Sequence, residues 1–176
     1  MSKILSYILK KVGISNEVKE ARKNGVVIGD NCKLYSVNLD YGHGYLIEIG
    51  NNCIITHCTI LAHDASTKLF VNKTKVGKVI IGDNCFIGMG SIILPNVTIG
   101  NNCIIGAGTI VSKNIPDNSV VVGNPCKIIK KTTEFINEHK EGMKTKPVFD
   151  TYWKNKTILQ KQEEKEKLKD NFGYDE

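Results

Sequence analysis

The chain has 176 residues, enough for one main domain with appendages, and its 41% hydrophobic and 24% charged residues exclude wholesale disorder. No apolar run approaches the roughly 18 residues that span a bilayer, so no transmembrane segment is expected. The formal charge of +6 comes mostly from lysine, and with Arg22 as the lone arginine and few aromatics we expect a polyanionic small ligand, such as a nucleotide, and no nucleic acid.

The N-terminal stretch from Ile4 to Leu9 is apolar and flanked by lysines. It is too short for a signal-peptide core and lacks a small-residue cleavage site, so we interpret it as an amphipathic helix within a helical segment 1–24. Without an export signal, a cytoplasmic location is expected. The six cysteines contain no Cys-x-x-Cys, which argues against a zinc ribbon and is consistent with free thiols in a reducing compartment.

A six-residue repeat dominates the centre of the chain. Branched anchor residues recur at Ile81, Ile87, Ile93, Ile99, Ile105 and Val111. Two positions before each anchor comes a small or branched residue, namely Val79, Cys85, Ser91, Val97, Cys103 and Thr109. The same frame is present earlier, at Ile28 and Leu34 and again at Ile49, Ile55 and Leu61, with interruptions at 36–46 and 62–78.

This period predicts an all-β solenoid over residues 25–131. Residues two apart on a strand face the same side, so each hexad offers two inward side chains and then a corner. Glycine follows many anchors and asparagine stands three after them, which we interpret as corner residues that tolerate positive φ. Three hexads close a triangular coil, and stacked coils bury the inner face. The period of six excludes an amphipathic helix.

The chain changes character after the repeats. Pro116 and Pro125 bracket an irregular segment, and a polar, lysine-rich tail then occupies 132–176. A helix is expected over 132–141, with Thr132 or Thr133 as its N-cap. The highly charged sequence from Lys154 onward is typical of a solvated or partner-packed helix.

Residues 80–131, and most specifically GNNCIIGAGTIVSKNIP and VGNPCKIIKK, resemble the hexapeptide-repeat acetyltransferases. They are similar to the galactoside, maltose and xenobiotic acetyltransferases and to bacterial polysaccharide O-acetyltransferases. The resemblance implies a left-handed parallel β-helix, a homotrimer, and acetyl-CoA as co-substrate with no metal required.

His63 opens the second interruption at a corner and matches the catalytic histidine of the family. An imidazole near neutral pKa suits the removal of a proton from an acceptor as it attacks the thioester carbonyl. Asp64 is a weaker candidate for orienting that ring, because neighbours on an extended chain point apart. His43 and Tyr45, in the first interruption, are candidates for the acceptor site.

The resemblance also carries over cofactor-binding positions. Phe86 stands where the galactoside enzyme has a tryptophan, while Ser112 and Lys113 match a Ser/Thr–Lys pair near the adenine. The remaining positions that match the path of the pantetheine arm and the phosphates are Met89, Gly106, Ala107, Lys127 and Lys130. Lysine meets a phosphate as a point charge, where the family arginines offer a bidentate fork.

Other readings of the same sequence remain open. A γ-class carbonic anhydrase needs three convergent histidines, and the candidates are His43, His57 and His63. A second alternative is a non-catalytic β-helix scaffold. This alternative does not explain the Ala-His-Asp loop or the Gly-Asn-Pro-Cys-Lys segment. A cysteine acyl carrier is disfavoured, because Cys53, Cys85 and Cys103 face inward.

The acceptor is the least defined part of the function. The tail EFINEHKEGMKTKPVFDTYW resembles tails of acetyltransferases from capsule or surface-polysaccharide gene sets. We therefore expect O-acetylation of a sugar hydroxyl in polysaccharide biosynthesis. N-acetylation of a nucleotide-linked amino sugar or inactivation of a drug is the next alternative.

Overall fold

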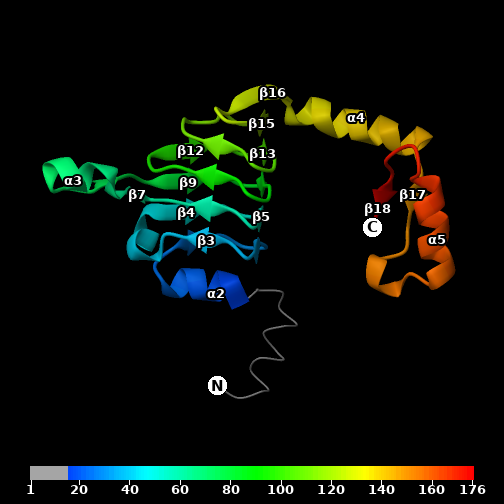
Figure 1. Ribbon diagram of the computed structural model, residues 1–176, viewed down its shortest axis with the longest axis horizontal. Coiled ribbons are helices and arrows are strands. Elements are labelled where there is room, and N and C mark those ends of the chain that lie inside the picture. Colours follow the sequence, from blue (N-terminus) through cyan, green and yellow to red (C-terminus); the bar gives the residue numbers. More distant parts are fainter. Residues whose placement is uncertain (1–15) are drawn as a thin grey trace, which may run out of the picture. The chain divides into compact units, whose positions relative to one another are not determined.

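The computed structural model describes residues 16–176 (Figure 1), so the helix expected at 4–9 lies outside the described residues. The chain divides into two compact units, one ending at Thr132 and the other spanning Thr133–Glu176. Helix α2 (Asn16–Lys23) packs against the first strands of the first unit, and its Val18 and Ala21 join the hydrophobic core.

Three parallel sheets form the walls of the first unit. The first wall contains β1 (Val27–Ile28), β4 (Ile47–Ile49), β9 (Val79–Ile81) and β12 (Val97–Ile99). The second contains β2 (Lys33–Tyr35), β5 (Ile54–Thr56), β10 (Phe86–Ile87), β13 (Ile104–Ile105) and β15 (Ser119–Val122), and β16 (Lys127–Lys131) pairs antiparallel with β15 at its edge. The third contains β3 (Asn38–Leu39), β6 (Thr59–Ile60), β11 (Ile92–Ile93) and β14 (Ile110–Val111). Each coil thus contributes one strand to each wall.

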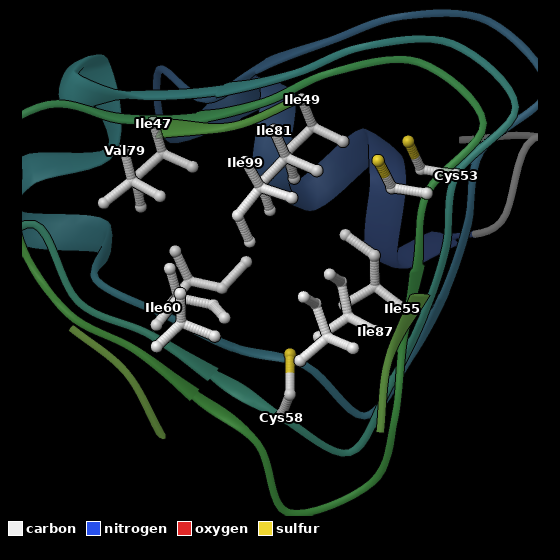
Figure 2. Close-up of a cluster of buried hydrophobic side chains, with 14 of the residues drawn as sticks. Ile47, Ile49, Cys53, Ile55, Cys58, Ile60, Val79, Ile81, Ile87 and Ile99 are labelled. Carbon is white, nitrogen blue, oxygen red and sulfur yellow. The ribbon is translucent and has the colours of Figure 1, made fainter. Parts of the chain in front are cut away.

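The expected inward residues form stacked ladders inside this triangle (Figure 2). On the first wall Ile49, Ile81 and Ile99 lie above one another, because strand pairing keeps them in register. All six anchors from Ile81 to Val111 are at most 1% exposed. The hexad frame therefore predicted the core of 79–111 correctly.

The frame was wrong at Leu61. The buried residue of β6 is Ile60, paired with Ile93, while Leu61 is only half-buried. The corner before β6 is one residue shorter than a hexad corner, and His57 within it takes a left-handed conformation with φ of 42°. The anchor therefore follows Ile55 after five residues.

The expectation that the anchor glycines supply positive φ was also wrong. Positive φ belongs to the asparagines, for example 57° at Asn84 and 56° at Asn102. A Cβ on Gly82 would instead lie 2.6 Å from Asn101 Oδ1 and 2.9 Å from the Asn101 backbone nitrogen. Glycine is needed there because the next coil passes too close for any side chain.

Both interruptions of the repeat leave the solenoid at one corner, between the third and first walls. The first is η1 (Tyr41–Leu46), and the second runs through β7 (His63–Asp64), η2 (Ala65–Thr67), α3 (Lys68–Val71) and β8 (Lys75–Val76) to form the projection on which α3 lies in Figure 1. We call residues 40–46, 61–78, 94–96 and 112–114 the insertion corner.

The second unit is small and mixed. Its elements are α4 (Thr132–Thr145, beginning at the last residue of the first unit), β17 (Val148–Phe149), η3 (Trp153–Asn155), α5 (Ile158–Lys167) and β18 (Tyr174–Asp175). Strands β17 and β18 pair in parallel. Helix α4 includes the expected 132–141 helix and extends beyond it.

Candidate active site

His63 lies at the root of the projecting loop. Strand β7 pairs antiparallel with β8, with His63 opposite Val76 and Asp64 opposite Lys75. This short ladder fixes the position of the His63 backbone. The His63 side chain remains 37% exposed, so the ring is held by the protein on one side and open on the other.

Asp40, which the sequence analysis overlooked, is the residue that holds the His63 ring. Its Oδ2 atom contacts His63 Nδ1 and accepts a hydrogen bond of 3.1 Å from the Ala62 backbone N–H. Only 5% of the Asp40 side chain is exposed. Burial by itself would raise the pKa of Asp40, but the hydrogen bonds from His63 and Ala62 outweigh it and lower that pKa below its ordinary value.

This contact determines the tautomer of His63. A carboxylate is an acceptor only, so the Nδ1 atom beside it carries the proton and Nε2 is left with its lone pair. The imidazole is therefore prepared to accept a proton at Nε2.

His43 adds a second imidazole to the same group. Its Nδ1 lies 3.5 Å from Asp40 Oδ1, and its ring centroid lies 4.8 Å from that of His63. The ligand atoms of Asp40, His43 and His63 all lie within 4.8 Å of one another, so this is the group of described residues that could hold a metal ion. The expectation of a metal-free enzyme stays a prediction.

The other two acceptor-site candidates lie at the edge of this cluster. Tyr45 is 65% exposed, with its ring centroid 6.2 Å from that of His43. Asp64 does not contact His63 Nδ1: its Oδ1 accepts the Ser66 backbone N–H at 2.9 Å, which caps η2 and is the main reason that the pKa of Asp64 is lowered.

A cavity of about 500 Å³ opens beside His63 at the insertion corner. Its apolar wall comes from Leu61, Leu94 and Pro95, and its polar groups include Lys75 and Ser112. Ser112 is thus the one predicted cofactor-binding residue that lines the same cavity as His63. Lys113 follows it in the chain and is exposed.

The remaining cofactor candidates lie elsewhere on the chain. Met89 is 59% exposed and, with Ala107, lies at the corner between the second and third walls, where Gly108 N–H donates to the Met89 carbonyl oxygen at 2.8 Å. Gly106 precedes Ala107 at that corner, Phe86 is 41% exposed on β10, and Lys127 and Lys130 lie on β16. One chain therefore carries the candidate base and most of the candidate cofactor residues on different corners.

His57 belongs to that second corner as well, where its carbonyl oxygen accepts the Gly90 N–H at 2.8 Å. The three histidines needed for a carbonic anhydrase site do not converge within the described chain. A cysteine acyl carrier is not supported either, because Cys53, Cys85 and Cys103 are buried inside the solenoid, where an acyl donor cannot reach their thiols.

Residues 78–113 match the family model described as bacterial transferase hexapeptide (six repeats). Protein CapG of Staphylococcus aureus is 44% identical over 137 residues, which cover 74% of this chain and 78% of CapG. The chain belongs to the hexapeptide-repeat acetyltransferase family. As a member of this family it is an acyltransferase.

Two further relatives agree with this assignment. The putative acetyltransferase YvoF of Bacillus subtilis is 44% identical over 97 residues, which cover 54% of each protein. A galactoside acetyltransferase solved in complex with coenzyme A shares 26% identity and a TM-score of 0.51, over 87% of this chain and 85% of that one. No helix among residues 16–176 of this acyltransferase is long and apolar enough to cross a membrane.

Proposed function

We propose that the chain transfers an acetyl group from acetyl-CoA to a sugar hydroxyl of a surface polysaccharide or its precursor, with His63 as general base. The observation that carries the proposal is the Asp40–His63 pair beside the 500 Å³ cavity. A buried carboxylate that holds Nδ1–H leaves Nε2 free to take a proton, which is the role of the general base in direct acyl transfer.

The proposed reaction balances in one transfer. The acceptor oxygen forms a bond to the thioester carbonyl carbon as its proton passes to His63 Nε2, and the carbon–sulfur bond then breaks. The sulfur leaves as a thiolate, takes the proton from the imidazolium and departs as coenzyme A. Asp40 stabilises the imidazolium that exists between these two proton transfers.

Acetyl-CoA fits the residues that this chain offers. The exposed Met89 and Ala107, next to the half-buried Gly106, give an apolar surface for the pantetheine arm, and Ser112 lines the cavity of His63. We assign Lys113, Lys127 and Lys130 to the phosphates as cationic contacts, and Phe86 to the wall of the cofactor groove. The coenzyme A complex of the related galactoside acetyltransferase supports the choice of acyl donor.

We infer a homotrimer from the family resemblance, and the separation of these groups supports a site shared between protomers. His63 and Met89 lie on different corners of one solenoid, so a complete site needs the insertion corner of one protomer beside the Met89 corner of another. Closed cyclic symmetry supplies such a contact once per protomer. Left-handed coiling completes the proposal by family resemblance, and the cytoplasmic location stays a prediction.

The experiment is an acceptor screen with acetyl-CoA and detection of the released thiol. We expect turnover with a hydroxyl sugar acceptor, and turnover that is greatest with an amino sugar would favour the N-acetyltransferase alternative. Binding of acetyl-CoA with no transfer to any acceptor would argue for a scaffold.

A further inference from the structure

The C-terminal unit contains a cavity of its own, unrelated to the insertion corner. It measures about 370 Å³ and is formed by one face of α5 together with Trp153 of η3 and Asp175 of β18. Every residue that lines it belongs to 153–175, so the cavity is a property of this unit alone.

The face of α5 that lines the cavity carries its charges in a fixed arrangement. Lys161, Glu164, Lys165 and Leu168 follow the spacing i, i+3, i+4 and i+7, which places their side chains on one side of a helix. A capping box between Thr157 and Gln160 fixes where this helix begins. The two lysines therefore present their ammonium groups side by side.

Lys156 fixes the floor of the cavity. Its Nζ lies 2.5 Å from Glu164 Oε2 and 2.6 Å from Asp175 Oδ1, and only 5% of its side chain is exposed. A buried ammonium held by two carboxylates joins η3, α5 and β18 at one point. Each carboxylate keeps further lone pairs with which it can accept hydrogen bonds from a ligand.

Trp153 supplies a broad aromatic surface beside these charges. It is the single tryptophan of the chain and is 57% exposed, with Lys154 Nζ 5.2 Å from its ring centroid. An indole combines a large apolar face with a polar edge, which suits a ligand that has an apolar face and polar substituents. The pyranose ring of a sugar is such a ligand, because its axial C–H bonds form an apolar face.

We propose that this cavity binds a carboxylated sugar unit of an acidic glycan. The sugar ring packs on Trp153, its carboxylate meets the ammonium groups of Lys161 and Lys165, and its hydroxyls donate to Glu164 and Asp175. Three lysines against two carboxylates give the lining a positive balance, which favours an anionic over a neutral glycan. This inference rests on the proposed function. If the enzyme acetylates a sugar, the cavity is a second binding site for the acceptor, and the acceptor is an acidic polysaccharide.

The single tryptophan provides the measurement. Hyaluronan oligosaccharides, which carry a glucuronate in every repeat, are titrated into the full-length protein while Trp153 emission is recorded. We expect a saturable change that weakens as salt rises, because the contacts with Lys161 and Lys165 are exposed and screened. Neutral dextran oligosaccharides of equal length should bind at least about tenfold more weakly.

The decisive variant is Lys161→Gln with Lys165→Gln, which should raise the dissociation constant roughly tenfold without altering the helix. The matched control is Lys140→Gln with Lys144→Gln on α4, the same charge change at the same spacing in the same unit. The Trp153→Ala variant has no tryptophan emission, so its binding to hyaluronan is measured by affinity electrophoresis through a gel that contains hyaluronan.

Three results would overturn the proposal: no saturable change in wild type, equal binding by the two double variants, or equal binding of polyglutamate, which has the charge without the sugar ring. None of them bears on catalysis. Thiol release from acetyl-CoA with a small acceptor reports on His63, and the Lys161→Gln/Lys165→Gln protein should retain it.

Discussion

Asp40 contacts His63 Nδ1 through a carboxylate that is almost wholly buried, although the two residues are 23 positions apart. Asp40 begins the first insertion and His63 begins the second, at the same corner of successive coils. The stacking of the coils therefore brings the two side chains together, and one coil alone could not form the pair.

His63→Ala should lower kcat by roughly 10²–10⁴, the usual contribution of a general base. Binding of acetyl-CoA should persist, because the proposed cofactor contacts lie on other residues. The measurement is thiol release under saturating substrates, with a separate binding titration. The control is His57→Ala, which removes an exposed imidazole at the other corner; a larger loss in this control would show that the base has been assigned to the wrong histidine.

Asp40→Asn should lower kcat while leaving the KM for acetyl-CoA nearly unchanged. An asparagine amide can donate to Nδ1, which would place the proton on Nε2 and remove the base from most molecules. We expect a loss on the order of 10² or more from the wrong tautomer. Asp64→Asn is the matched control, since its carboxylate caps η2. Equal losses in both variants would contradict the role of Asp40.

Asp40 should also make stability depend on pH in the acid range. Its pKa in the folded protein is lowered, so its contribution to stability is complete above the pKa of an unfolded aspartate, about 3.9, and is lost as pH falls through the lower folded value. The difference in thermal midpoint between wild type and Asp40→Asn should shrink as pH falls from about 6 to 3. A difference in thermal midpoint that stays constant over this range would show that Asp40 does not contribute to the pH dependence of stability.

The core of residues 79–111 could be predicted from sequence because every inward position obeys one period. The corner before Ile60 could not, since it is one residue shorter and His57, not asparagine, takes the left-handed conformation there. The residue types do not give the length of this corner, because histidine tolerates positive φ without requiring it.

The candidate base could be named from sequence, and the residue that contacts it could not. His63 was identified by its place at the start of a loop, whereas Asp64 was considered as its partner because it is adjacent in the chain. The signal that was available is that both interruptions leave the third wall at the same point: Leu39 pairs with Ile60, so Asp40 lies beside the start of the second insertion. The separation of the proposed cofactor residues from His63 also depends on the coil and not on any local pattern.

Gly82→Ala should destabilise the solenoid by roughly 1–3 kcal/mol, as overpacking against a rigid neighbour does. The new methyl would meet the Asn101 backbone nitrogen at 2.9 Å, and that coil is held by pairing on both sides. Gly42→Ala is the control, because its methyl would find nothing closer than 3.7 Å. Thermal unfolding compares the two, and equal midpoints would contradict close coil approach as the reason for glycine.

Changing Lys113, Lys127 and Lys130 together to glutamate should raise the KM for acetyl-CoA and leave the fold intact. The proposed contacts are exposed charges, so the increase should be largest at low salt and shrink as salt screens them. The control carries the same total charge change at Lys140, Lys144 and Lys169 in the second unit. An unchanged KM for acetyl-CoA at low salt would show that these lysines do not contact the cofactor.

Mixing two inactive variants tests whether the active site is shared between protomers. The His63→Ala protein lacks the base, and the Lys127→Glu/Lys130→Glu protein has a weakened cofactor surface away from the insertion corner. If a site takes its base from one chain and these lysines from the next, mixed trimers contain some sites that are wild type on both sides. Co-refolding of the two variants should therefore restore a substantial share of activity, and light scattering should give a mass near three times 19.5 kDa.

Either variant refolded alone is the control and should stay inactive at low acetyl-CoA. A mixture with no recovered activity would place the base and the lysines in the same chain's site, and an active monomer would contradict the trimer itself.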